Sequence, residues 1–221
     1  MNLSKSYEYF KPTADRIHII GCGSVGSTIA ENLARLGVSK MTLYDFDTVE
    51  PHNIANQMFR DKDIGKLKVD AVRDIITEIN PDAKDDIALE PKGWNGKPVS
   101  GIAFLAVDTI ELRRKFVETN MDNPYLKAVF DIRTGLEDAQ HFAADWSVRK
   151  QKENLLKGMQ FSHEDAMEAT PMSACGMVLG VAPTVRVISA YAVANYVNFA
   201  NGKPLRNLIM ADSFNFTTDA Y

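Results

Sequence analysis

The chain has 221 residues, of which 45% are hydrophobic and 24% charged; these values are typical of a folded globular protein and argue against disorder. Its 25 basic residues against 29 acidic ones give a formal net charge of −4, which excludes a strongly basic nucleic-acid-binding protein. The two cysteines, Cys22 and Cys175, are too few for a four-thiolate zinc site or a disulfide scaffold. We therefore expect no zinc and a reducing, cytoplasmic compartment.

The N-terminal part predicts a strand, a glycine turn, a helix and a second strand. Residues 1–15 are polar and predict a loose N-terminal arm, and residues 16–20 predict a buried strand. The glycine-rich turn of residues 21–26 follows at once, and a helical pattern then runs to Gly37. Residues 41–46 predict the second strand. Strand, helix and strand within about thirty residues are typical of a parallel crossover unit.

The middle of the chain continues this alternation after a polar connection over residues 47–64. Long ordered connections are usually functional, so this one is a candidate site region. We expect helices over 65–79 and 109–120, and strands over 86–90, 102–107 and 126–132. Strands alternating with helices predict a mostly parallel sheet covered on both faces.

The last third has a different pattern. We expect a strand over 140–148, a long crossover loop over about 150–172, a helix over 175–200 and antiparallel closing strands within 206–218. The apolar stretch 177–199 contains Pro183, Arg186 and Asn195, which favours a buried helix over a membrane span; a dimer contact is the alternative. The prediction is one Rossmann-like, doubly wound α/β domain over residues 16–221.

The glycine turn predicts a nucleotide site. Gly21, Gly23 and Gly26 allow a tight turn and a close approach of backbone to phosphate, and the following helix adds N–H donors. Asp45 ends the second strand, where an acid can meet a ribose hydroxyl. The alternatives are a turn that needs glycine only for packing and a solvated carboxylate at a strand end. A nicotinamide or flavin oxidoreductase would fit these residues equally well.

The next segment resembles the ThiF/MoeB/E1 family, whose members activate ubiquitin-like and sulfur-carrier proteins with ATP. The resemblance covers about residues 15–135 and rests on Asp45 and Asp47, Asn53 and Gln57, Lys68, and Asp108 after a later strand. It implies that Asp45 binds the ribose, that Asn53 and Gln57 lie near the phosphates, and that Lys68 stabilises charge as pyrophosphate leaves. It also implies that Asp108 holds Mg²⁺ or positions the triphosphate.

Each of these side chains also has a structural interpretation. Lys68 could be a solvated helix lysine, and Asn53 and Gln57 could be turn residues. Asp108 could instead cap the helix that follows it, with Arg113 as a surface partner. Further along, Asp131 and Arg133 lie at the C-terminal end of an expected strand and could shape the acyl-acceptor site or pair with each other.

The sequence departs from the family pattern at Asn56, where the family has an arginine that meets the triphosphate. An amide supplies neither the charge nor the fork of a guanidinium, so turnover could be lost. Arg60 lies four residues further on and could substitute. Cys175 precedes the long apolar helix and could accept an acyl group, although buried cysteines are common in cores.

The resemblance implies adenylation of a carboxylate with ATP and Mg²⁺, and the expected carboxylate is the C-terminus of a small carrier protein. It further implies a homodimer. No nucleic-acid or membrane partner is expected. A catalytically degenerate nucleotide-binding scaffold is the alternative function.

Overall fold

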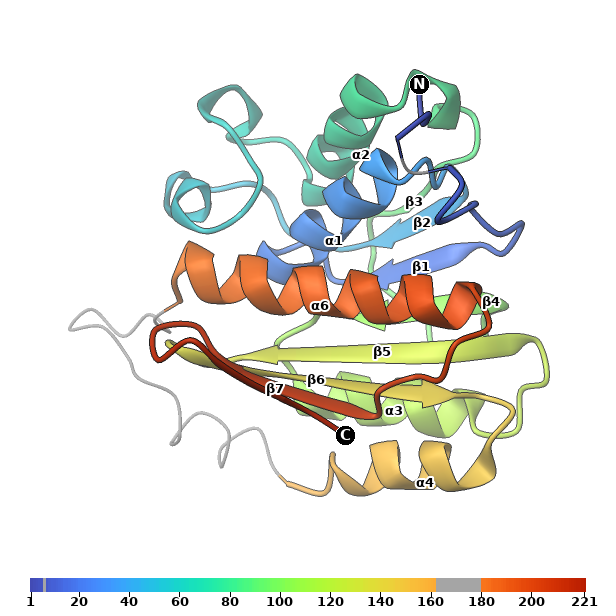
Figure 1. The fold of residues 1–221 in the computed structure, drawn as a ribbon. Coiled ribbons are helices and arrows are strands. Elements are labelled where there is room, and N and C mark those ends of the chain that lie inside the picture. The colour runs from blue at the N-terminus through green and yellow to red at the C-terminus, as the bar shows by residue number, and fades with distance from the viewer. Residues whose placement is uncertain (6, 162–179) are drawn as a thin grey trace.

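A computed structural model describes residues 1–5, 7–161 and 180–221 as one mixed sheet with helices on both faces (Figure 1). The strands are β1 Ile17–Ile20, β2 Met41–Tyr44, β3 Ala88–Glu90, β4 Gly101–Leu105, β5 Leu126–Thr134, β6 Asp138–Asp145, β7 Leu208–Asp212 and β8 Thr217–Ala220. The helices are α1 Ser24–Arg35, α2 Lys68–Ile79, α3 Ile110–Asn120, α4 Arg149–Lys157 and α6 Ala182–Ala200, with short 3₁₀ helices η1 Pro51–Ala55, η2 Asp61–Asp63 and η3 Pro81–Ala83.

The sheet has the order β3-β2-β1-β4-β5-β6-β7-β8. The first five strands in this order, β3, β2, β1, β4 and β5, are parallel. The last three, β6, β7 and β8, each pair antiparallel with the strand before them. The order reverses at β1, because the chain moves to β2 on one side and to β4 on the other. In open α/β sheets, ligands bind beside the carboxyl ends of the strands at such a reversal. The predicted doubly wound sheet with antiparallel closing strands is confirmed.

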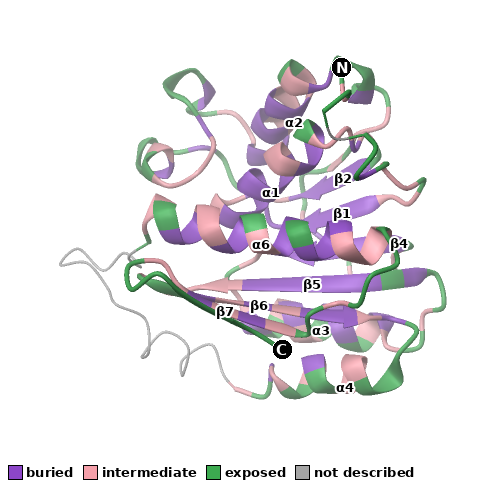
Figure 2. Ribbon diagram, viewed as in Figure 1, coloured by how far each residue is buried: buried purple, intermediate pink, exposed green. Residues whose placement is uncertain are grey.

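The core lies in two layers on either side of this sheet. Helices α1, α2 and α6 cover one face, and α3 and α4 cover the other (Figure 1). Every residue of β1, β2 and β4 is buried, as expected for central strands with both faces covered, while the exposed residues gather in turns and on outer helix surfaces (Figure 2). Helix α6 packs on the sheet through a buried stripe that includes Ile188, Ala192 and Tyr196. Among the described residues, no helix has the length and apolarity that crossing a membrane requires.

Two local predictions were wrong. The region expected to begin a long crossover loop opens with α4, which packs Leu155 beneath the sheet, and the rest of that region, residues 162–172, lies outside the described residues. The N-terminal arm is not loose along its whole length, because Phe10 is only 3% exposed and its ring meets that of Tyr196 edge-on.

Candidate functional site

The glycine turn connects β1 to α1, and its three glycines are needed for different reasons. Gly21 has a φ of +94°, and a Cβ there would lie 2.7 Å from the carbonyl oxygen of Ala106. A Cβ on Gly26 would overlap the carbonyl oxygen of Gly21, so this glycine lets the helix pack against the turn. A Cβ on Gly23 would meet nothing within 4 Å. Gly23 therefore leaves open space at the start of α1, where backbone N–H groups point outward.

Asp45 lies directly after β2 and beside the glycine turn. One carboxylate oxygen accepts a 2.7 Å hydrogen bond from the amide of Cys22, and the other accepts a 2.9 Å bond from the amide of Asp47. Burial raises the pKa of Asp45, and the two amide donors and the positive charge of Lys68 oppose that shift. The neighbouring thiol of Cys22 is buried, and burial raises its pKa well above the usual value, so it is a packing group rather than a nucleophile.

Lys68 is the first residue of α2, and the chain brings it back to the end of β2. Its backbone amide donates to the carbonyl of Asp47, and its ammonium donates to the carboxylate of Asp47 at 2.8 Å. The residue is only 8% exposed. Lys66, two positions earlier, points elsewhere and pairs with Asp63 and Asp74. The structure therefore brings Lys68, but not Lys66, to the glycine turn and Asp45.

The connection that contains η1 positions two further predicted residues. The side-chain oxygen of Asn53 accepts a bond from the amide of Glu50 and so closes the first turn of η1. The side-chain oxygen of Gln57 is buried without a hydrogen-bond partner in the described part of the chain. Asn53 thus has a structural role in this connection. The side-chain oxygen of Gln57, by contrast, is free to accept a hydrogen bond from a ligand.

Asp108 follows β4 at the same edge of the sheet, and it is exposed. Within the described residues its carboxylate takes part in no hydrogen bond or ion pair. The cap of α3 is Thr109, and no side chain bonds the free amides there, so the interpretation of Asp108 as a helix cap was wrong. In the described part of the chain, no group of three or more acidic, histidine or cysteine side chains could hold a metal ion.

Arg113 is not the surface partner that the sequence suggested. It is buried and donates to the carboxylate of Asp131, which is fully buried, and to the carbonyl of Leu105. Arg133 binds the other carboxylate oxygen of Asp131. The two arginines therefore hold Asp131 within β5, and the pairing interpretation of Asp131 and Arg133 is confirmed.

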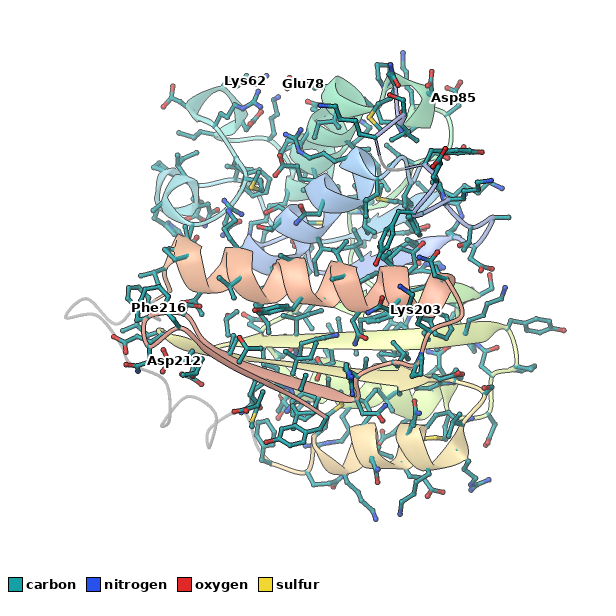
Figure 3. The ribbon with its side chains drawn as sticks, in the orientation of Figure 1. Lys62, Glu78, Asp85, Lys203, Asp212 and Phe216 are labelled. Carbon is teal, nitrogen blue, oxygen red and sulfur yellow. The ribbon has the colours of Figure 1, made fainter. Side chains whose placement is uncertain are left out.

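Asn56 and Arg60 mark the departure from the family pattern. Arg60 pairs with Glu78 at 2.9 Å, and Lys62 pairs with the same carboxylate at 2.6 Å. Figure 3 shows Lys62 and Glu78 together at the outer edge of the molecule. Arg60 therefore does not supply the cation that Asn56 lacks. Cys175 lies outside the described residues.

The structure adds Arg186 to this region. It lies in the second turn of α6, and its guanidinium donates to the hydroxyl of Thr28 in α1. In the sequence, Arg186 is a single cation inside an otherwise apolar helix pattern. Nothing in that pattern indicates that its side chain lies near the glycine turn.

The comparisons with known proteins agree with one another. The family model described as "ThiF family" matches residues 11–220. The chain is 40% identical over 101 residues to ubiquitin-like modifier-activating enzyme 5 of Arabidopsis thaliana, and the match covers 46% of this chain and 22% of that protein. The Dictyostelium discoideum enzyme of the same name is 37% identical over 84 residues, covering 38% and 22%. The chain thus covers less than a quarter of the length of these relatives.

Among solved structures, Escherichia coli MccB with ATP superimposes with a TM-score of 0.67 at 18% identity, covering 97% of this chain and 64% of that one. MccB with MccA gives a TM-score of 0.70 at 17% identity and the same coverage. PaaA gives a TM-score of 0.68 at 18% identity, covering 94% of this chain and 64% of that one. These likenesses show a shared fold.

Proposed function

The chain belongs to the ThiF family, and on that premise we propose that it adenylates a carboxylate with ATP. The observation that carries the proposal is the meeting of Gly23, Asp45 and Lys68 where the strand order reverses. This edge offers open backbone donors for phosphate, an acid for the ribose, and a buried ammonium. The relatives named as ubiquitin-like modifier-activating enzymes support the same reaction.

In this reaction, one carboxylate oxygen of the acyl substrate attacks the α-phosphorus of ATP. The new oxygen–phosphorus bond forms as the bond from that phosphorus to the bridging oxygen of the β-phosphate breaks. The products are an acyl adenylate and pyrophosphate. Negative charge grows on the phosphoryl and leaving oxygens, so cations and N–H donors that are fixed beforehand lower the barrier. Lys68 provides such a cation, and the start of α1 provides the donors.

Mg²⁺ fits this site as a companion of the nucleotide. Mg²⁺ usually takes one or two protein carboxylates and completes its shell with phosphate oxygens and water. Asp108 is exposed at the end of β4 and has no partner within the described residues, so it can provide such a carboxylate. The ion would neutralise charge on the phosphates.

We infer that the acyl substrate is the C-terminus of a small carrier protein. The printed names of the relatives refer to ubiquitin-like modifiers, and MccB was solved with MccA, so activation of small proteins or peptides is the common theme. A homodimer belongs to the same proposal, because symmetric dimers are the commonest soluble oligomers. Light scattering of the purified protein tests the dimer.

Titration calorimetry tests the nucleotide site. The wild-type chain should bind ATP with Mg²⁺ and not NAD⁺. Lys68→Ala should weaken ATP binding on the order of 10- to 100-fold, because a charge-assisted contact is lost. Lys66→Ala is the matched control, since Lys66 is occupied by Asp63 and Asp74 and should leave affinity unchanged. An ATP affinity of Lys68→Ala equal to that of the wild-type chain would refute the assigned site.

Pyrophosphate exchange tests the chemistry. Radiolabelled pyrophosphate should enter ATP only when a carrier with a free C-terminal carboxylate is added, and an amidated C-terminus should abolish exchange. A second candidate function, a nucleotide-binding scaffold, is favoured by Asn56 and by the outward pairing of Arg60. ATP binding without exchange for any carrier, together with exchange created by Asn56→Arg, would support the scaffold.

A further inference from the structure

Arg186 lies between two helices that begin at the same end of the sheet. Helix α6 runs alongside α1, and both start on the left of the view, where the parallel strands end (Figure 1). The guanidinium donates to the hydroxyl of Thr28, and that hydroxyl donates at 2.8 Å to the carbonyl of Ser24, the first residue of α1. These contacts place a cation beside the first turns of the helix that follows the glycine turn.

The guanidinium of Arg186 has no carboxylate partner within the described residues; its one hydrogen bond there is to a neutral hydroxyl. Burial lowers its pKa, and only the charge of Glu31 opposes that shift. The Glu31 carboxylate is itself held by Arg35 through bonds of 3.0 and 2.6 Å. A partly buried guanidinium without a counter-charge is costly, and its remaining N–H donors are suited to an anion.

The charges of the candidate site call for such a cation. Three carboxylates lie at this edge, those of Asp45, Asp47 and Asp108, and the ammonium of Lys68 already pairs with Asp47. A nucleoside triphosphate adds further negative charge. Without more positive charge, like charges would oppose binding.

Asn56 lies against Gly180, just before the start of α6. Its side chain is an amide and supplies no positive charge. A Cβ built on Gly180 would be 3.3 Å from the side-chain nitrogen of Asn56. The connection containing η1 and the start of α6 are therefore neighbours, and a cation on either segment can serve the same region.

We propose that Arg186 is a substrate-binding residue that contacts the β- and γ-phosphates of ATP, in place of a cation absent at Asn56. This inference rests on the proposed function, since it takes ATP as the ligand. The guanidinium uses one donor on Thr28 and directs others at phosphate oxygens. Thr28 is then a positioning residue, because it holds the guanidinium beside α1.

Calorimetry with two nucleotides separates this role from a structural one. ATP carries the β- and γ-phosphates and AMP does not. Arg186→Gln should weaken binding of ATP with Mg²⁺ on the order of 10- to 100-fold and leave AMP affinity unchanged. Arg149→Gln removes an exposed arginine on α4 and should change neither affinity. Asn56→Arg added to Arg186→Gln should recover ATP affinity.

The outcomes are distinguishable. If the wild-type protein binds neither ATP nor AMP, both the proposed function and this inference are refuted. Wild-type binding with an unchanged ATP affinity in Arg186→Gln, or with equal losses for ATP and AMP, would overturn the inference alone. Thermal melting checks that the variant is folded. If it is not, Thr28→Val replaces it as a variant of the same shape: a few-fold loss for ATP alone supports the role, and an unchanged ATP affinity overturns it.

Discussion

The carboxylate of Asp45 accepts a 2.7 Å hydrogen bond from the backbone amide of Cys22, which joins the end of β2 to the glycine turn after β1. Its second oxygen accepts the amide of Asp47 and thereby turns the chain away from the sheet. Asp45 therefore shapes the turn as well as the place where a ribose would lie. Loss of nucleotide binding in a variant at this position has two possible causes, and the choice of variant must separate them.

Asp45→Ala should both destabilise the fold and weaken ATP binding. It leaves two backbone amides without their acceptor, which costs roughly 1–3 kcal/mol of unfolding free energy. Asp45→Asn keeps one acceptor oxygen and should retain more of the stability while still losing ribose affinity. Urea denaturation and calorimetry on both variants give the two quantities. Equal stability of Asp45→Ala and wild type would contradict the structural half of this role.

Gly23 and Gly26 form a matched pair for separating binding from folding. Gly23→Ala places a methyl group in open space, so it should cost less than about 1 kcal/mol of stability but block the approach of phosphate to the start of α1. ATP affinity should then fall about tenfold or more. Gly26→Ala drives a methyl group into the carbonyl of Gly21 and should cost roughly 3 kcal/mol or more. Thermal melting and ATP titration of both variants test the pair. A Gly23→Ala protein with wild-type ATP affinity would refute phosphate binding at this turn.

The sequence predicted those parts of the fold whose pattern is local. The glycine turn, the acid after β2 and the buried strands are recognised from neighbouring residues. Closely spaced glycines indicate a turn, and short apolar runs indicate buried strands. Helix α4 was missed because its sequence is highly charged and Leu155 is its one buried residue, so no apolar stripe is visible. The arm was misjudged for a related reason, since Phe10 is a single apolar residue whose partner, Tyr196, lies in α6.

Side chains whose environment depends on distant partners could not be predicted. Arg113, in helix α3, is buried because Asp131 of β5 neutralises it, and nothing near Arg113 in the sequence indicates this. The same holds for Arg186, whose contact with Thr28 joins residues far apart in the chain. Charged residues are normally exposed, so their burial is specified by the tertiary fold and not by a local pattern.

Asp131→Asn should be strongly destabilising. It leaves the guanidiniums of Arg113 and Arg133 in the interior without their shared counter-charge, and breaking a buried pair in this way costs about 3–5 kcal/mol. Glu153→Gln is the control, because it removes the carboxylate of an exposed pair with Arg149, which contributes less than about 1 kcal/mol. Urea denaturation of the two variants gives both values. A loss for Asp131→Asn no larger than that of the control would mean that the network adds nothing to stability.

Two buried histidines should make the fold sensitive to acid. Burial lowers the pKa of His18 to about 4 and that of His141 to about 4, from an ordinary value of 6.5. Between pH 6.5 and 4 the unfolded chain takes up protons at these positions while the folded chain does not. Their contribution to the unfolding free energy is therefore complete above pH 6.5. It falls as the pH drops toward 4 and changes no further below that value. One pKa unit corresponds to about 1.4 kcal/mol, so each histidine lowers the unfolding free energy by up to about 3.5 kcal/mol over this window.

Replacing one of these histidines should remove its share of the acid sensitivity. His141→Phe suits this purpose, because the imidazole stacks on the ring of Phe130, and Asn195 keeps its bond to the carbonyl of Arg206. Urea denaturation at pH 7, 6 and 5 should show a shallower fall in unfolding free energy for this variant than for wild type. His52→Gln, at an exposed histidine beside Glu50, should retain the wild-type slope. An unchanged slope in His141→Phe would mean that His141 already carries its proton in the folded state, and that its contact with Asn195 is arranged differently.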